Sequence, residues 1–293
     1  MSRFINRQIA KLDKKEHKML QKKSSGFVQK NIDSISERLE DKIPQNLRDT
    51  LENAFEKAFR LVLEKGTGVI EKTYSKDRAA FEHEINDFAV DANKHRMAVR
   101  KYMKNMDRIS RNSRIVGKGL SFAEGAGLGL LGIGIPDIPV FISVMLKGIY
   151  ETATSYGYEY DNPQERMYIL KLIQAALCED EDKYLKNHEV DRWADDIRKK
   201  HWHGDLEKEI KDTAKILSDN MLFAKFIQGL PIVGVTGSLF NLSTYSKVSE
   251  YAALKYKKRY LESKKEKAKI TDKKERVPDI FFRIYVWECV FRV

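Results

Sequence analysis

Apolar side chains recur at three- and four-residue steps through much of the chain, which is the spacing of one face of a helix. The clearest run follows Pro44 and consists of Leu47, Leu51, Ala54, Phe55, Ala58 and Val62. Proline is well tolerated at the first turn of a helix, and Gly66 and Gly68 are typical of a helix end. We therefore predict an amphipathic helix between Pro44 and Gly66 that buries one face.

Residues 92–118 predict a second helix, with two unlike faces. One face is basic and consists of Arg96, Arg100, Lys104, Arg108 and Arg111, extended by Arg114 and Lys118. The adjoining face is apolar and consists of Val99, Tyr102, Met103, Met106 and Ile109. Such a helix either packs its apolar face into a core with the basic face in water, or rests the basic face on phosphate, anionic lipid or nucleic acid. The pattern leaves both interpretations open.

The composition changes abruptly between Gly125 and Leu146, where Asp137 is the only charged residue. The stretch is close to the roughly 20 residues that span a bilayer. Glycines crowd its first half, however, and Pro136 and Pro139 bracket Asp137, so a regular spanning helix is disfavoured. A helix, a tight turn and a second helix fit the pattern better.

A similar apolar stretch, also broken by glycine and proline, runs from residue 226 to 242. We predict an all-α fold, a multi-helical bundle with two Gly/Pro-broken apolar helical hairpins in the core, at residues 120–150 and 226–250. The alternative is that these hairpins dip into a membrane while the basic helix at 92–118 lies on anionic lipid.

Local signals place further boundaries. A break is predicted at Tyr156–Tyr158, and a polar cap at Asp161 or Asn162 followed by Pro163 predicts the start of another helix. A tyrosine-rich helix is expected from about residue 243 to 265. We divide the chain into a basic N-terminal arm at 1–30, a helical domain at 31–266 and a C-terminal tail of unknown structure at 267–293.

The composition narrows the setting and the partners. The chain has 293 residues with a formal net charge of +11, which favours anionic partners. Cys178 and Cys289 form no metal-binding spacing and no disulfide framework, so a reducing intracellular compartment is the simplest interpretation. The N-terminal residues lack the apolar run of a secretory signal peptide. We expect a cytoplasmic protein, with a position at the inner face of the membrane as the further possibility.

Candidate catalytic chemistry is sparse. Asp137 either caps the helix that follows it or belongs to a site together with Glu124 or Glu151, where paired carboxylates would serve acid–base chemistry or bind a hard cation. The GxGxxG pattern at 127–132 has a basic helix rather than a strand before it, which argues against a dinucleotide site. His201 and His203 diverge on the helix expected there. We predict no cofactor and no metal.

Two long runs carry a resemblance to a known family. The first, residues 123–170, combines a glycine-rich apolar run, a PDIP turn, a YGY break and a helix opened by proline. The second, residues 229–261, combines an apolar Pro-x-x-Gly-x-x-x-Gly segment with a helix that ends in a basic Tyr-Arg cluster. Together they resemble the EcsC family over roughly residues 34–262. The resemblance implies a bacterial, cytoplasmic or membrane-peripheral protein associated with an ATP-binding-cassette (ABC) exporter, and it supplies no catalytic residue.

Three functions remain open at this point. The leading hypothesis is a non-enzymatic accessory factor at the cytoplasmic face of the membrane, bound to an ABC transporter subunit or to anionic lipid. The second is a hydrolase or cation-dependent enzyme centred on Asp137. The third and least favoured is nucleic-acid binding on a stacking platform, formed by tyrosines and cations of the helix at 243–265: Tyr245, Tyr251, Tyr256, Tyr260, Lys255, Lys257, Lys258 and Arg259. Burial of these tyrosines in the core is the simpler expectation, and no oligomeric state is predicted.

Overall fold

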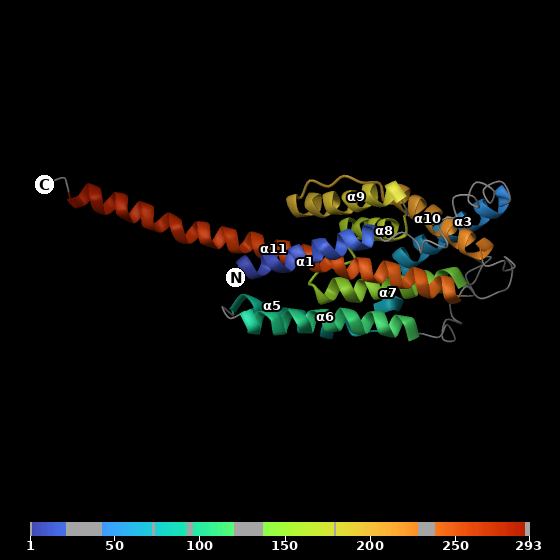
Figure 1. Ribbon diagram of the computed structural model, residues 1–293, viewed down its shortest axis with the longest axis horizontal. Coiled ribbons are helices and arrows are strands. Elements are labelled where there is room, and N and C mark those ends of the chain that lie inside the picture. The colour runs from blue at the N-terminus through green and yellow to red at the C-terminus, as the bar shows by residue number, and fades with distance from the viewer. Residues whose placement is uncertain are drawn as a thin grey trace.

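The computed structural model describes residues 2–21, 43–71, 74–92, 96–119, 137–178, 180–227 and 238–290. Within these ranges the regular elements are helices and no strand occurs, so the all-α prediction is confirmed (Figure 1). The helices are α1 (Ser2–Gln21), α3 (Gln45–Leu61), η1 (Val62–Gly66), α4 (Thr67–Glu71), α5 (Lys76–Ala92), α6 (Arg96–Gly119), α7 (Asp137–Ser155), α8 (Pro163–Leu177), α9 (Asp180–Lys199), α10 (Leu206–Ile227) and α11 (Ser238–Val290).

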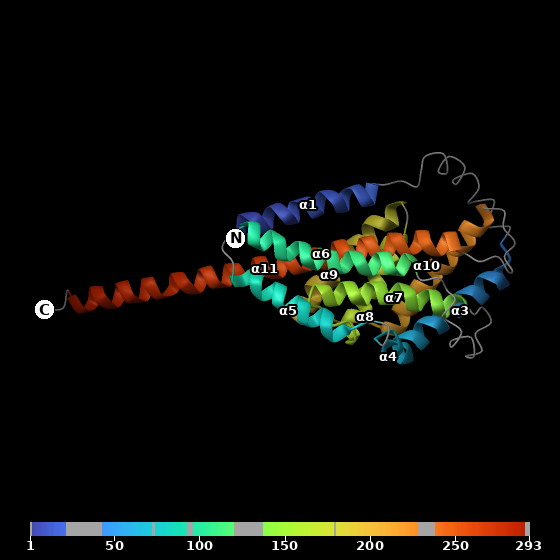
Figure 2. The same ribbon diagram turned by 90° about the horizontal axis from the view of Figure 1, so that it is seen from below.

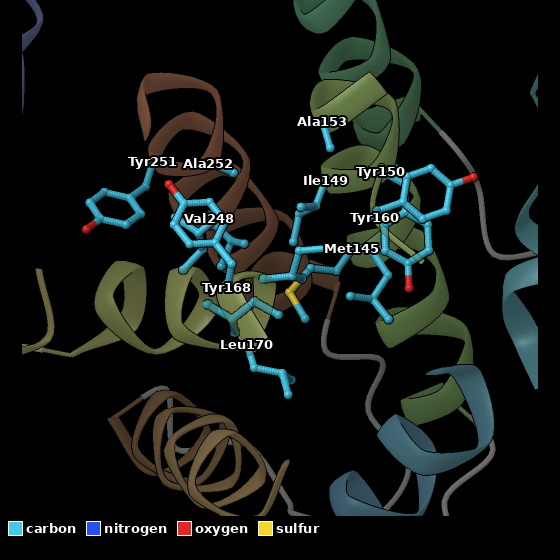
Figure 3. Packing of buried hydrophobic residues seen from close by; sticks show 14 of the residues in the cluster. Met145, Ile149, Tyr150, Ala153, Tyr160, Tyr168, Leu170, Val248, Tyr251 and Ala252 are labelled. Atoms are coloured by element: carbon cyan, nitrogen blue, oxygen red, sulfur yellow. The ribbon is translucent and has the colours of Figure 1, made fainter. Parts of the chain in front are cut away.

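Helices α7 and α11 pack against each other, and other helices surround them. Helix α7 also contacts α3, α5 and α6, whereas α11 also contacts α1, α6 and α8. Figure 3 shows Ile149 of α7, Tyr168 of α8 and Val248 of α11 meeting in the core. The Tyr245 side chain of α11 packs directly over Gly148 of α7, where it occupies the space that a Cβ atom would need.

Helix α7 is the second arm of the first predicted hairpin. Its buried side chains are Ile138, Phe141, Ile142, Met145, Leu146, Ile149, Tyr150 and Ala153. Its half-buried side chains lie along one side of the helix: Val140, Ser143, Val144, Lys147 and Glu151. The first arm of that hairpin and the turn of the second, at 120–136 and 228–237, lie outside the described residues. Among the helices that the structure does describe, none is long and apolar enough to cross a membrane.

The helix after Pro44 does not end at its glycines, which corrects the sequence prediction. The chain continues from α3 through the π-helical turn η1 into α4, which ends at Glu71. The wider turn buries Val62 and Leu63. A Cβ atom at Gly66 would lie 3.0 Å from Val62, so a glycine at this position serves close packing within the helix rather than its termination.

The boundary before α8 follows the local signals. Gly157 has a φ of +79°, a left-handed conformation that favours glycine. Asn162 is the N-cap, since its side chain accepts a hydrogen bond from the backbone N–H of Glu165 at 2.8 Å, and Pro163 is the first helical residue. Residues 201–205, which were expected to be helical, form instead the connection between α9 and α10.

Both terminal segments are helical where the structure describes them. The lysine-rich N-terminal segment forms α1, which packs on α11 and buries Ile5 and Glu16. The segment at 267–290, assigned above to a tail, continues α11. With 53 residues at ~1.5 Å each, α11 is about 80 Å long, and it projects well beyond the bundle (Figures 1 and 2).

Candidate functional site

The two faces of α6 lie as the sequence predicts. Its apolar residues Val99, Met103 and Met106 are buried. The basic residues on the opposite face are exposed: Arg96, Arg100, Lys104, Arg108 and Arg111. None of these five forms an ion pair with another residue that the structure describes. The side chains of Arg114 and Lys118, predicted to extend the face, lie outside that part of the chain. We call the five exposed residues the α6 cationic face.

A groove of about 430 Å³ lies between α1 and the start of α6. Its lining includes basic side chains from both helices, namely Arg7, Lys11, Lys14, Arg96 and Arg100, and no acidic one. Phe4 and Met97 contribute apolar surface. The groove therefore joins two residues of the α6 cationic face to three cations of the N-terminal helix. We call it the α1–α6 groove.

The cations of α11 behave differently, because acidic residues of the surrounding helices neutralise them. Lys255 is almost fully buried, pairs with Glu16 of α1 and lies 2.7 Å from the Asp191 carboxylate of α9. Lys258 is 2.7 Å from Glu16. Burial works to raise the pKa of the Glu16 carboxyl, but Lys255 and Lys258 outweigh it, so this pKa lies below its usual value.

Two further lysines of α11 are paired in the same way. Lys257 lies 2.6 Å from Asp107 of α6. Lys264 lies 2.8 Å from Asp87 and 2.6 Å from Asp91, both on α5. These ion pairs hold α5 and α6 against α11.

Arg259 pairs with a carboxylate and also lies between aromatic rings. Its guanidinium donates two hydrogen bonds to the Glu165 carboxylate, at 2.7 and 3.2 Å. It also lies 4.2 Å from the centroids of both the Tyr158 and the Tyr168 rings, in cation–π contact. Burial works to lower the pKa of Arg259, but the Glu165 carboxylate and the neighbouring tyrosines outweigh it, so this pKa lies above its usual value.

These contacts rule out the stacking platform considered for nucleic acid. Tyrosines available to stack on bases must be exposed, yet the four concerned are buried: Tyr245, Tyr251, Tyr256 and Tyr260. The interleaved cations are paired with acids of the bundle, as described above. The simpler expectation, that these tyrosines belong to the core, is confirmed.

The structure also shows a partly buried chain of hydroxyl groups that the sequence did not indicate. Tyr74 donates to the Tyr160 hydroxyl at 2.7 Å, and Tyr160 donates to the Glu71 carboxylate at 2.7 Å. Lys76 lies 2.9 Å from the same carboxylate. Burial raises the pKa of Tyr74 to about 12, so the chain is neutral except for the Glu71–Lys76 pair. Its members come from α4, α5, the connection between them and the connection between α7 and α8, so its role is to bind these segments together.

Comparison with known proteins adds the family. The model described as "EcsC protein family" matches residues 6–261. This chain belongs to the EcsC family. The family match begins inside α1, within the segment that the sequence assigned to an arm, and ends within α11, two residues after Arg259.

Two relatives from Bacillus subtilis (strain 168) are similar over part of their length. The chain is 26% identical to "Protein EcsC" over 133 residues, which is 44% of this chain and 53% of that protein. It is 27% identical to "Uncharacterized protein YdbA" over 142 residues, which is 46% of this chain and 51% of that protein. The chain thus spans about half the length of the curated relatives it matches. No solved structure matches it.

Two of the carboxylates singled out in this EcsC-family chain, Asp137 and Glu151, lie on the same helix. Asp137 is the first residue of α7, and Glu151 lies fourteen residues later on the same helix. At ~1.5 Å per residue they are about 21 Å apart along the axis, too far to share a proton or a cation. Glu151 lies 4.0 Å from Lys147. Glu124 and the Asp137 side chain lie outside the described residues.

The described residues can also be compared with the requirements of a metal site. Within the described ranges, no group of three or more His, Cys, Asp or Glu side chains is arranged to hold a metal ion. His201 and His203 lie in the connection between α9 and α10 and are exposed.

Proposed function

We propose that this EcsC-family protein is a non-enzymatic accessory factor that binds the anionic cytoplasmic surface of a membrane through the α6 cationic face. The observation that carries the proposal is the contrast between two sets of cations. The cations of α11 are neutralised by acids inside the bundle, whereas those of the α6 cationic face are exposed and form no ion pair with a described residue.

The energetics favour a lipid surface as the partner. Basic residues close to an anionic leaflet contribute about 1 kcal/mol each. Their row along one side of α6 presents several of them to a flat surface at once. The attraction weakens with salt, because the Debye length falls from about 10 Å at 0.1 M to about 3 Å at 1 M. Binding should therefore be strong at low ionic strength and weak at high ionic strength.

Vesicle flotation tests the proposal with charge-neutral variants. The triple variant Arg100→Gln/Lys104→Gln/Arg108→Gln should lower the partition coefficient onto phosphatidylserine-containing vesicles by about a hundredfold at low salt. The matched control replaces three exposed lysines of α10 by glutamine: Lys208, Lys211 and Lys215. That control should bind nearly as well as the parent.

Three results would count against the proposal. One is the absence of binding to protein-free anionic vesicles at low salt. Another is an equal loss in the α10 control, which would mean that net charge alone decides. The last is a tight, salt-dependent gel shift with nucleic acid in place of vesicle binding, which would redirect the same cations to the alternative partner. An acidic transporter subunit as the partner would give the first result with protein-free vesicles.

A further inference from the structure

Helix α5 presents an apolar face to solvent. Phe81, Ile85 and Phe88 follow one another at steps of four and three residues, so they share one side of the helix. Phe81 is 61% exposed, Ile85 50% and Phe88 75%. Large apolar side chains at this spacing normally point into a core. Here the inward side of α5 carries Asn86 and Val90 instead, and both are buried.

The α1–α6 groove lies at the end of the molecule where α5 ends. Helix α5 ends at Ala92 and α6 begins at Arg96, so Phe88 and Met97 lie on the two sides of one corner of the bundle. Met97 is 86% exposed and also lines the groove. Figure 2 shows the end of α5, the start of α6 and the start of α1 at the same end of the molecule. The apolar face of α5 therefore ends at the same end of the molecule as the groove lined by five cations.

We propose that this corner inserts into the interfacial region of an anionic bilayer, with the α5 side chains among the acyl chains and the α1–α6 groove around a phospholipid phosphate. The proposal rests on the proposed function and adds an insertion site to it. Its charge pattern is that of interfacial helices, in which Phe and Leu are immersed and Lys and Arg lie at headgroup level. Phosphate suits the groove because guanidinium groups bind its oxygens with paired hydrogen bonds.

Several acidic residues near the face oppose an anionic surface. Lys264 binds both Asp87 and Asp91 and so balances one of their two negative charges. Asp77, four residues before Phe81, is exposed. Glu84 is exposed beside Phe81 and Phe88 on α5 and forms no ion pair with a described residue. The Glu84→Gln variant should therefore bind anionic vesicles more tightly than the parent, by a factor of a few.

Depth-dependent fluorescence quenching tests the insertion directly. In the Phe88→Trp variant the added tryptophan should be quenched by lipids brominated along their acyl chains. The matched control is Leu185→Trp, at a position that is also exposed, at 58%. Its helix α9 lies on the other side of the bundle from α5 (Figure 1). The control should show no quenching beyond that of the parent protein.

Partition measurements separate insertion from simple charge attraction. Phe88→Ser should lower the partition coefficient by about tenfold at both low and high salt, since apolar burial does not depend on screening. Leu185→Ser should have no effect. Because both side chains are exposed, circular dichroism should show the parent helix content in each variant.

Calorimetric titration with inorganic phosphate distinguishes a groove that binds free phosphate from one that binds the phosphate of a lipid headgroup. No heat with phosphate alone, together with vesicle binding that is lost in Arg7→Gln/Lys11→Gln, supports a lipid phosphate. Saturable phosphate binding without vesicles would overturn the lipid assignment.

Vesicle binding with no quenching of Phe88→Trp would overturn insertion and leave the proposed function standing. A dimer that Phe88→Ser dissociates would show that a second copy covers the face, and would overturn the proposal as well.

Discussion

Replacing Glu165 by glutamine isolates the charge of one buried ion pair. Glu165 is buried in the first turn of α8 and accepts both hydrogen bonds from the Arg259 guanidinium. Glutamine has nearly the same volume and keeps one oxygen that can accept one of these bonds. The substitution therefore removes the negative charge without opening a cavity, and it leaves a buried guanidinium without its counter-charge.

The expected loss follows from the burial of both partners. Removing one member of a buried pair costs about 3–5 kcal/mol, because the remaining charge stays desolvated. The rings of Tyr158 and Tyr168 keep their cation–π contacts with Arg259, so the lower end, about 3 kcal/mol, is expected. For a domain of this size that corresponds to a fall in Tm of roughly 6–12 °C.

Urea unfolding followed by circular dichroism measures this loss. The matched control is Arg198→Gln on α9, whose pair with Glu266 of α11 is 36% and 46% exposed. It should lose no more than about 1 kcal/mol, because exposed pairs contribute little. The double variant Glu165→Gln/Arg259→Met should lose less than Glu165→Gln alone, since it leaves no unbalanced charge. A loss in Glu165→Gln no larger than that of the control would refute the reasoning.

Two other predictions concern acid stability and close packing. Because Lys255 and Lys258 depress the pKa of Glu16, its contribution to stability is complete above the unfolded value of 4.5 and is lost as the pH falls through the lower folded value. Glu16→Gln should therefore flatten the dependence of Tm on pH below about 4.5, and an unchanged acid slope would contradict this. Gly148→Ala should lower the free energy of unfolding by about 1–3 kcal/mol, because the added methyl group overpacks α7 against α11. Gly68→Ala, whose methyl group would meet nothing within 4 Å inside α4, should raise it by about 0.5–1 kcal/mol in the same urea assay. Equal effects of the two substitutions would refute the packing argument.

The features that the sequence predicts well are those with local causes. Asn162 and Pro163 act on the backbone within one turn, so the start of α8 can be inferred from a few residues. The two faces of α6 follow from the helical period alone, because each side chain's direction is set by its position along the helix. The all-α class follows from the same periodicity repeated along the chain.

The features that the sequence does not reveal depend on distant partners. The run Lys255–Arg259 has the composition of an exposed basic helix, yet Lys255 pairs with a residue 239 positions away and Arg259 with one 94 positions away. Gly66 has the local signature of a helix end. The chain continues past it because neighbouring helices bury Val62 and Leu63 in the π-helical turn.

The pairing of the α11 cations also changes where the net positive charge is found on the molecule. A formal charge of +11 suggests a molecule that is basic all over. Once the cations between Lys255 and Lys264 are set aside with their carboxylates, the α6 cationic face and the α1–α6 groove stand out as a one-sided excess. A one-sided charge orients as well as attracts, because this corner gains more than the rest of the described bundle from approaching an anionic surface. Docking there would direct the opposite end, where α3 packs on α10, away from the surface and leave it free to meet other partners (Figures 1 and 2).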